Sequence, residues 1–483
     1  MAPRTQAIEH RNRHRRGLSA PWRRGMHGAA CFAALLALLS ATVPSASAEE
    51  NAAPTPPMGW NSWDAYGLTI NEADYRANVG VMKALKSSGW TYAVIDEGWY
   101  MDNPFGDKLA NRVYQLDGNG LLIPSEARYP SSANGAGFKP LADWVHQQGL
   151  KFGTHIVRGI PKHAVERDLP IAGSNYRASD AADTADTCLW DDGDYGVRDN
   201  AAGQAYYDSM MALYAVWGVD YLKVDCIADH PYKESEIRQI AAAIKKAGRP
   251  IVLSLSPGPA QLRRAIEFRR YSQLWRISND IWDGWDFRPK STPDGYPSGV
   301  VTAFDHLAEW NGWAGAGHWP DADMLPFGSL TPHPGMGEPR QTRLTHDEVR
   351  TQFTLWSISR SPLILGANLT KLDDFTRSII TNKDVIAINQ TAWESQPVAG
   401  LPSEFANARV WHALAGPRKK PTEYFAFFNV GEEPITLNAT WKQLGVHQFK
   451  STRDLWTGTR KAASGGRIKV TLPAHATALY RVE

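Results

Sequence analysis

From Pro54 onward, short strand-like runs alternate with segments of helical pattern, and this alternation constrains the fold more than any other feature of the chain. The alternation is typical of a parallel sheet whose strands are joined by crossover helices. The strand-like runs are MGWNSW (58–63), TYAVIDEGW (91–99), LKFGTHIVR (150–158), VDYLKVD (219–225), PIVLSLS (250–256), LWRIS (274–278), GHW (317–319) and SPLILG (361–366). Eight parallel strands are the number that closes a (β/α)8 barrel.

The intervening segments have helical apolar spacing, and several of them end in glycine, as helix C-termini often do. Examples are EADYRANVGVMKALKSSG (72–89), FKPLADWVHQQG (138–149), KESEIRQIAAAIKKAG (233–248) and THDEVRTQFTLWSIS (345–359). An open doubly wound sheet is the competing fold, but no G-x-G-x-x-G motif follows the first strand, and no phosphate-binding G-x-x-x-x-G-K-[ST] motif occurs. We therefore expect an α/β chain with a TIM barrel over residues 54–390.

After about Gln390 the pattern changes to short strand-like runs that are separated by turns, without helical segments. The runs are ARVWHAL, EYFAFFNV, PITLNATW, RIKVTLP and TALYRV. They predict a small antiparallel β-sandwich domain over residues 391–483. We expect this domain to have a packing or sugar-binding accessory role, and the active site to lie in the barrel.

The first 48 residues differ from the rest of the chain. Seven arginines precede the apolar run AACFAALLALL, and the segment ends in Ala46-Ser47-Ala48. This order is typical of a secretory signal peptide, and the apolar run is shorter than the roughly 20 residues that span a bilayer. We therefore expect export, a mature chain that starts near Glu49, and no membrane anchor after cleavage.

Without this leader the formal charge changes sign. The whole chain has a formal charge of +2, and removal of seven arginines and Glu9 leaves 45 Lys and Arg against 49 Asp and Glu, or −4. Nothing in the mature chain indicates a nucleic-acid or anionic-membrane surface. Cys31 lies in the leader, so Cys188 and Cys226 either form one disulfide in an oxidising compartment or remain two buried thiols. The oligomeric state is open.

Acidic residues gather where the predicted strands end, which is where barrel enzymes place their catalytic groups. They are Asp64 after the first strand, Asp96 and Glu97 at the second, Asp225 at the fourth, Asp280 after the sixth, and Asp321 and Asp323 after the seventh. One such acid alone is more often a helix cap or a loop hydrogen-bonder. The repeated pattern predicts a site at one rim of the barrel, with Asp225 and Asp280 as the leading pair.

The chain also has 19 tryptophans, several of them beside strand ends: Trp60, Trp63, Trp99, Trp275, Trp282, Trp285 and Trp319. Aromatic rings stack on the apolar faces of sugars, although any one tryptophan is more often part of a core. Two carboxylates without a cofactor suit glycosidic cleavage, in which one attacks the anomeric carbon and the other protonates the leaving oxygen. Lys223 faces the same side of its strand as Asp225, so its charge would keep that aspartate ionised and it would bind substrate hydroxyls.

These segments are also similar to a known family. PPMGWNSWDAYG, VIDEGW, YLKVDC, WRISNDIWDGW, GHWPDADML and SPLILGANL, in this order, resemble the α-galactosidase (melibiase) family, glycoside hydrolase family 27. The resemblance covers about residues 54–390, and a C-terminal β-sandwich is typical of the family. It implies a secreted, retaining, exo-acting enzyme that removes terminal α-D-galactose and needs no metal or cofactor.

The resemblance also implies residue roles. Asp225 of the K-V-D motif matches the family nucleophile, and Asp280, four residues after Arg276, matches the acid/base. The positions that line the sugar subsite are Trp60, Asp96, Glu97, Lys223, Arg276, Asp323 and Met324.

Three departures from the family pattern concern the sugar. Glu97 stands where the family usually has a second aspartate, and this longer side chain would press on the hydroxymethyl group of galactose, which β-L-arabinopyranose lacks. His155 stands where an aromatic is frequent, and Ser256 replaces the acid that binds O2, as in the α-N-acetylgalactosaminidases. Isomalto-dextranases resemble the family in barrel and catalytic pair. Alternative glycones are therefore β-L-arabinopyranose, N-acetylgalactosamine and isomaltose units.

Two further interpretations are weaker. His155 and the HWPDAD segment (318–323) suggest a metal site, but no H-x-x-x-H or C-x-x-C spacing accompanies them, and we expect none. A carbohydrate-binding protein on an inactive barrel is disfavoured because both catalytic acids are present. We expect the insert at residues 159–204, which contains Cys188, to be a loop that walls the pocket.

Overall fold

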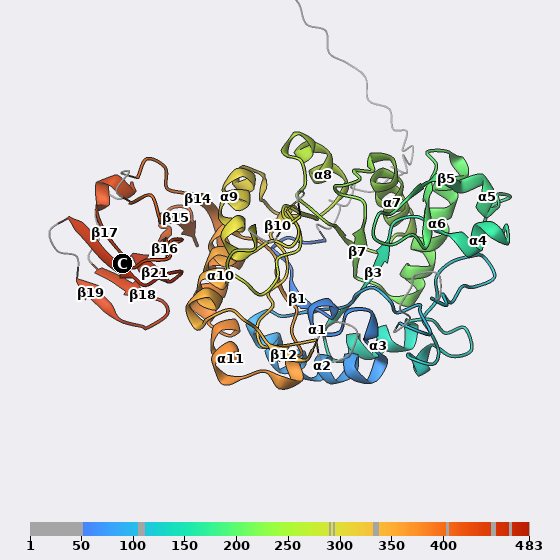
Figure 1. The fold of residues 1–483 in the computed structure, drawn as a ribbon, viewed down its shortest axis with the longest axis horizontal. Helices are drawn as coiled ribbons and strands as arrows, with labels where there is room; N and C mark the ends of the chain where they lie inside the picture. Colours follow the sequence, from blue (N-terminus) through green and yellow to red (C-terminus); the bar gives the residue numbers. More distant parts are fainter. Residues whose placement is uncertain are drawn as a thin grey trace, which may run out of the picture. The chain divides into compact units, whose positions relative to one another are not determined.

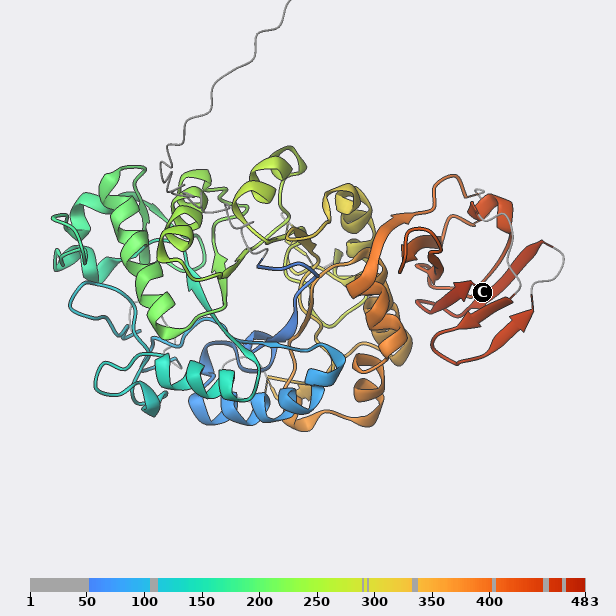
Figure 2. The same cartoon turned by 180° about the vertical axis from the view of Figure 1, so that it is seen from behind.

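The structure of the chain is a computed structural model, shown from two sides in Figures 1 and 2. It describes residues 52–104, 112–288, 291–292, 295–331, 338–401, 405–445, 451–462 and 466–482. The predicted signal peptide, residues 1–48, lies outside the described residues.

Eight parallel strands form the barrel sheet. Their order is β10 (Trp319–Asp321), β9 (Leu274–Arg276), β8 (Val252–Leu255), β7 (Tyr221–Asp225), β3 (Lys151–Val157), β2 (Tyr92–Ile95), β1 (Met58–Asn61) and β13 (Leu363–Leu365). The ring closes just after β10, where the Leu325 amide donates to Ile364 O at 2.7 Å and Leu325 O accepts from the Gly366 amide at 3.0 Å. The predicted (β/α)8 barrel is confirmed.

Each barrel strand coincides with a predicted run, but the seventh is displaced. The sequence places it at residues 317–319, whereas β10 is Trp319–Asp321. The segment after Trp319 has the composition of a turn, yet Pro320 and Asp321 pair in register with Trp275 and Arg276 of β9. Tertiary pairing therefore extends the strand beyond its local sequence signal.

The helices that connect the barrel strands bury one apolar face. The longer ones are α2 (Glu72–Leu85), α3 (Lys139–Gln147), α6 (Ala201–Trp217), α7 (Glu234–Ala247), α9 (Val300–Trp310) and α10 (His346–Ser359). In α2, for example, Tyr75, Val79 and Met82 recur at helical spacing and are fully buried, and the Asn71 side chain caps the helix by accepting from the Asp74 amide. Among the described residues, every helix is too short or too polar to span a lipid bilayer.

The insert after β3 is not a plain loop, contrary to expectation. Its strands β4 (Ile160–Pro161), β6 (Asp194–Val197) and β5 (Ala182–Thr187) form a small antiparallel sheet, with α4 (Lys162–Glu166) and α5 (Ala178–Ala181) between them. The polar β5 has no strand-like apolar pattern. An ion pair fixes it to the barrel instead, because the Arg158 guanidinium lies 2.9 Å from both Asp186 and Glu236 carboxylates.

The C-terminal strands form two antiparallel sheets. One has the order β14 (Ala392–Pro397), β15 (Ala408–Ala415), β16 (Thr422–Asn429), β21 (Thr477–Val482), β18 (Ser451–Asp454) and β19 (Arg460–Ala462). The other pairs β17 (Ile435–Thr440) with β20 (Arg467–Leu472). Apolar side chains such as Phe425, Phe427 and Val470 fill the core of this predicted β-sandwich, which is confirmed.

Candidate active site

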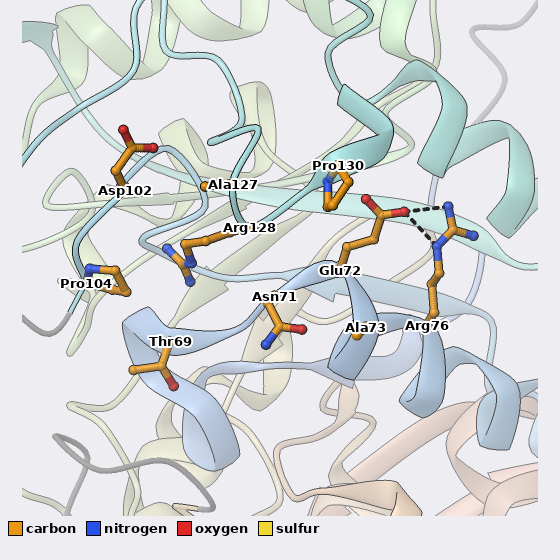
Figure 3. Close-up of a pocket in the computed structure, with 10 residues that line it drawn as sticks. All are labelled: Thr69, Asn71, Glu72, Ala73, Arg76, Asp102, Pro104, Ala127, Arg128 and Pro130. Atoms are coloured by element: carbon orange, nitrogen blue, oxygen red, sulfur yellow. Dashed lines mark hydrogen bonds and ion pairs between the residues drawn. The ribbon is translucent and has the colours of Figure 1, made fainter. Parts of the chain in front are cut away.

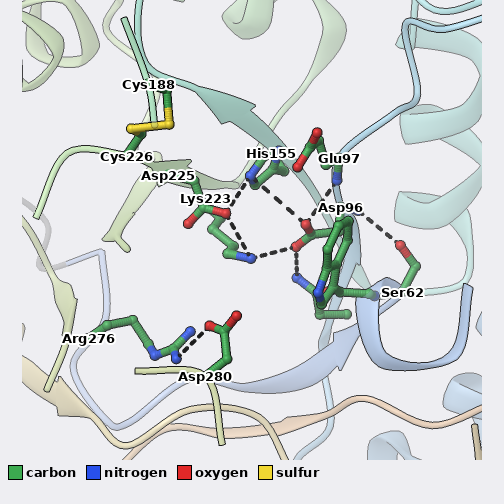
Figure 4. Close-up of polar contacts among 12 residues, drawn as sticks. Ser62, Asp96, Glu97, His155, Cys188, Lys223, Asp225, Cys226, Arg276 and Asp280 are labelled. Carbon is green, nitrogen blue, oxygen red and sulfur yellow. Dashed lines mark hydrogen bonds and ion pairs between the residues drawn. A yellow bond between two sulfur atoms is a disulfide. The ribbon is translucent and has the colours of Figure 1, made fainter. Parts of the chain in front are cut away.

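The carboxyl ends of β2, β3, β7 and β9 bring five charged or polar side chains together at one end of the barrel (Figure 4). Asp96 directly follows β2, His155 lies in β3, Lys223 and Asp225 lie in β7, and Arg276 ends β9. The parallel register of β3 and β7 sets His155 beside Lys223. The strand geometry therefore places residues that are far apart in the sequence within contact distance.

Asp225 has one engaged and one uncommitted carboxylate oxygen. Its Oδ2 lies 2.8 Å from His155 Nε2 and 3.4 Å from Lys223 Nζ, whereas Oδ1 accepts no hydrogen bond from any described residue. Burial opposes ionisation, but the Lys223 charge and then His155 outweigh it and hold the pKa of Asp225 well below its usual range. The side chain is thus held as an ionised carboxylate, the state that a nucleophile requires.

Lys223 is shared between two carboxylates. Its Nζ donates to Asp96 Oδ2 at 3.0 Å, and the same oxygen accepts from Asn61 Nδ2 at 2.6 Å. Burial disfavours the ammonium, but Asp225 and Asp96 outweigh this and raise the pKa of Lys223. Burial likewise opposes the charge of Asp96, yet Lys223 and His155 lower the pKa of Asp96. The centre of the site is therefore a charge-compensated cluster.

Arg276 connects a second pair of acids. One of its guanidinium nitrogens, Nη2, lies 3.0 Å from Asp280 Oδ1 and 2.7 Å from Asp323 Oδ2. Burial opposes the cation, but Asp323 and Asp280 outweigh it and raise the pKa of Arg276. Asp323 also accepts from the Ile281 amide at 2.6 Å, which holds the backbone beside Asp280. The Asp280 side chain is 36% exposed, against 15% for Asp225, so it is the acid more accessible to water.

Glu97 lies beside this cluster and is nearly buried. Its Oε1 is 4.0 Å from Arg112 Nη1. Burial, and then the negative charges of Asp191, Asp96 and Asp225, raise the pKa of Glu97 well above its usual range. A long carboxyl side chain with a raised pKa therefore occupies the position where the sequence predicts contact with the far end of the sugar.

The structure also locates the remaining residues that the sequence assigns to the site. Trp60 is fully buried. Its Nε1 donates a hydrogen bond to Ala367 O at 2.7 Å, and its ring packs edge-on against Tyr66. Ser256 directly follows β8 beside Asp225, and Met324 follows β10 with 9% of its surface exposed. Trp60 thus contributes to the barrel core, whereas Ser256 adjoins the predicted nucleophile.

Cys188 and Cys226 form a disulfide, which settles the choice between a bond and two thiols. Cys226 directly follows Asp225, and Cys188 belongs to the insert after β3. Both are buried against Val157. The bond therefore fastens the insert to the rim of the barrel beside the predicted nucleophile (Figure 4).

Comparisons with known proteins agree with this geometry. Residues 187–391 match the family model described as Alpha galactosidase A, and residues 409–482 match that of the Alpha galactosidase C-terminal beta sandwich domain. The chain is 38% identical to a solved β-L-arabinopyranosidase of glycoside hydrolase family 27 from Geobacillus stearothermophilus, with a TM-score of 0.81 over 89% of this chain and 97% of that chain. The chain belongs to glycoside hydrolase family 27.

Curated relatives of this family 27 enzyme carry α-galactosidase names. It is 29% identical to Alpha-galactosidase A of Cellvibrio japonicus over 92% of this chain and 96% of that protein. It is 28% identical to an α-galactosidase of Cyamopsis tetragonoloba over 90% of this chain and 87% of that protein. The resemblance predicted from the motifs is confirmed, and the protein is a glycoside hydrolase.

The sequence interpretation of this family 27 enzyme assigned no role in the site to three buried polar residues. Asn61 binds Asp96, Asp191 lies close enough to Glu97 to raise its pKa, and Asp64 adjoins Asp323 and Asp280. Asn61 ends the first strand and Asp64 follows it, at the same rim as the predicted acids, so their position was a usable signal. The position of Asp191 gave no such signal, because this residue lies in the insert and not at a strand end.

The charged form of Asp64 is opposed by both burial and neighbouring negative charges. It is 3% exposed, and its Oδ2 accepts no hydrogen bond from any described residue. A Cβ atom on Gly366 would lie 1.8 Å from this oxygen, so glycine is required there. Burial, and then Asp323 and Asp280, raise the pKa of Asp64 well above its usual range.

Replacing Asp64 by Asn is expected to stabilise the fold at alkaline pH. Below the unfolded-state pKa, both states bind the proton; as pH rises toward the folded-state pKa, the unfolded state releases it first, so only the wild type loses stability. The gain should grow with pH to at least about 1.4 kcal/mol, the equivalent of one pKa unit. Urea unfolding of both proteins at pH 4 and pH 8 measures it. A difference that does not change with pH would contradict the prediction.

A cavity of about 600 Å³ lies apart from the charged cluster (Figure 3). It is lined by Thr69, Asn71, Glu72, Ala73, Arg76, Asp102, Pro104, Ala127, Arg128 and Pro130. Its charged groups are already committed: Glu72 pairs with Arg76 at 2.7 Å, and Arg128 donates to backbone carbonyls of Gly98, Met101, Leu68 and Ile70. None of the predicted site residues lines it, so the chemistry belongs to the charged cluster.

One trio in the cluster has the ligand types for a metal ion. Atoms of Asp96, His155 and Asp225 lie within 4.8 Å of one another. However, the Lys223 ammonium contacts both carboxylates of this trio, at 3.0 and 3.4 Å. A cation of the protein therefore already compensates the charge that a metal would neutralise, and the trio suits ionisation of Asp225 better than metal binding.

Proposed function

We propose that this enzyme is a retaining exo-glycosidase that removes terminal α-D-galactose residues from oligo- or polysaccharides, with Asp225 as nucleophile and Asp280 as acid/base. One observation carries the proposal: Lys223 and His155 keep Asp225 ionised, while the partly exposed Asp280 lies on Arg276 in the same cluster. The α-galactosidase names of the curated relatives support this choice of sugar.

In the first step, the Asp225 carboxylate attacks the anomeric carbon and forms a glycosyl-enzyme ester. The bond from that carbon to the leaving oxygen breaks, and this oxygen takes the proton of the Asp280 carboxyl. In the second step, the Asp280 carboxylate takes a proton from water, whose oxygen attacks the anomeric carbon and releases Asp225. Two displacements retain the anomeric configuration, so we expect the two carboxyl groups to lie about 5 to 5.5 Å apart in the enzyme.

A panel of nitrophenyl glycosides tests the proposal. It contains the α-D-galactoside, the β-L-arabinopyranoside and the α-N-acetylgalactosaminide, and an assay for isomaltose release from dextran is run beside it. Fastest turnover of the α-galactoside with α-galactose as first product, measured by proton NMR, supports the proposal. An inverted product contradicts the double displacement, and no turnover of any substrate favours a non-catalytic carbohydrate-binding protein.

A specific observation favours β-L-arabinopyranose as the second candidate sugar. The buried Glu97 reaches one methylene further than the aspartate usual in the family, and β-L-arabinopyranose has the ring configuration of galactose without its hydroxymethyl group. The solved relative at 38% identity is a β-L-arabinopyranosidase, whereas the curated α-galactosidases are 28 to 29% identical.

Replacing Glu97 by Asp is expected to move the preference toward galactose. The shorter side chain frees space for the hydroxymethyl group, and one methylene in a pocket is worth about tenfold or more in kcat/KM. The ratio of kcat/KM for the two nitrophenyl glycosides measures the change. Glu97→Gln is the matched control, because it keeps the length and should keep the wild-type ratio. Equal ratios in wild type and Glu97→Asp would remove Glu97 as the determinant.

We also propose that the enzyme acts outside the cytoplasm. The signal-peptide pattern of residues 1–48 supports this location. The Cys188–Cys226 disulfide supports it independently, since disulfides persist in oxidising compartments.

A further inference from the structure

A row of four aromatic rings crosses the boundary between the barrel and the C-terminal domain. The His475 ring stacks on Trp285 with centroids 4.1 Å apart and planes at 14°. Trp285 meets Phe304 of α9 edge-on at 6.3 Å, and Phe304 meets Phe428 of β16 edge-on at 5.1 Å. The two barrel rings, Trp285 and Phe304, thus lie between two rings of the C-terminal domain.

Trp285 belongs to the segment that begins with Asp280. This segment runs beside residues 298–301: the Ser298 amide donates to Asp280 O at 2.9 Å, and the Trp282 amide donates to Ser298 O at 3.1 Å. Further along, the Val301 amide donates to Trp285 O at 3.0 Å. Backbone hydrogen bonds to residues 298–301 therefore connect the Trp285 end of this segment to Asp280.

His475 is itself fixed, so it can act as a support. Its Nδ1 lies 2.8 Å from Glu348 Oε1, and its backbone carbonyl accepts from Thr351 Oγ1 at 2.6 Å. Glu348 is nearly buried in the first turn of α10, where its other oxygen accepts from the Thr345 amide. The imidazole is only 15% exposed, and its Nε2 lies 3.2 Å from Glu432. His475 therefore stacks on Trp285 from an anchored position.

We propose that His475 of the C-terminal domain is a positioning residue for Asp280, acting through the stacked Trp285 ring. The domain then has a function beyond packing: it holds the acid/base segment at the rim of the barrel. The proposal rests on the proposed function in one respect, the assignment of Asp280 as acid/base. A second anchor of the same segment, Asp283 held by Arg340 and by the Arg343 amide, lies wholly within the barrel. Loss of His475 should therefore misplace Asp280 without unfolding the segment.

The test is the dependence of rate on the leaving group. A 2,4-dinitrophenolate leaves without protonation, whereas an alcohol or a sugar needs the acid. For His475→Ala, kcat/KM should fall about tenfold on the methyl glycoside or disaccharide, because a small misplacement of an acid is costly, and should stay within about twofold on the 2,4-dinitrophenyl glycoside. His475→Phe keeps an aromatic ring on Trp285 and should restore most of the lost rate.

Two comparison variants separate the possible outcomes. Trp456→Ala removes another contact of the C-terminal domain with α10, in which Trp456 Nε1 donates to Thr354 Oγ1 at 3.1 Å, and should lower both rates equally or not at all. Asp280→Asn should show the same dependence on leaving group as His475→Ala, with a larger loss of kcat/KM on substrates that need the acid. If Asp280→Asn shows none, the acid assignment fails. Suppose that Asp280→Asn shows the dependence on leaving group, but His475→Ala lowers the rates on both substrates equally or lowers neither rate. Then only the positioning role of His475 is overturned.

Discussion

Replacement of Asp225 by Asn is expected to lower kcat by about 10⁴-fold or more while leaving the fold intact, since no other group can form the glycosyl ester. The substitution is nearly isosteric, and Lys223 keeps its 3.0 Å contact with Asp96, so no cation is left without a partner. Nitrophenyl glycoside kinetics measure the loss. Circular dichroism and thermal unfolding monitor the fold.

A smaller variant shows which role Asp225 has. In Asp225→Gly the space of the carboxylate is open to azide, which attacks the anomeric carbon once and gives a glycosyl azide of inverted configuration. Restored turnover with an inverted azide therefore identifies Asp225 as the nucleophile. A retained azide product, or an Asp225→Asn variant with near wild-type kcat, would assign the attack to another residue.

The barrel is largely predictable from the sequence because buried parallel strands are apolar on both faces. The run 219–225 shows this: Tyr221, Leu222 and Val224 are buried, and β7 forms within the predicted limits. Prediction is weaker where pairing, not composition, decides. β10 extends into Pro320 and Asp321 because β9 pairs with them, and β5 of the insert is held by an ion pair of Arg158.

The site, like the fold, has features that the sequence predicts and features that depend on tertiary contacts. Residues that end barrel strands, such as Asp96, Lys223 and Asp225, meet because the strands are parallel and in register, so their grouping could be inferred without coordinates. The contacts between these side chains could not be inferred in this way. The sequence does not show that His155 contacts Asp225, or that Asp191 from the insert lies close enough to Glu97 to raise its pKa. Trp60, which the resemblance places in the sugar subsite, is fully buried, as are His155 and Asp96.

Replacement of Asp280 by Asn is expected to lower kcat by about 10²- to 10⁴-fold on substrates whose leaving oxygen must be protonated, the usual contribution of general acid catalysis. Arg276 keeps its 2.7 Å contact with Asp323, so the loss should be chemical and not structural. On a 2,4-dinitrophenyl glycoside the first step needs no proton, and the glycosyl enzyme should accumulate because the second step lacks its base. A burst of dinitrophenolate followed by slow turnover measures both effects.

With azide, Asp280→Asn is expected to give a glycosyl azide of the opposite anomeric configuration to the one from Asp225→Gly. Here azide attacks the accumulated glycosyl enzyme on Asp225, so two displacements occur and the glycosyl azide retains its configuration. The two azide products together assign both acids, because exchanging the roles would exchange the configurations. The environments of the two side chains already differ: Asp225 is held ionised by Lys223 and His155, whereas 36% of the Asp280 side chain is exposed to solvent.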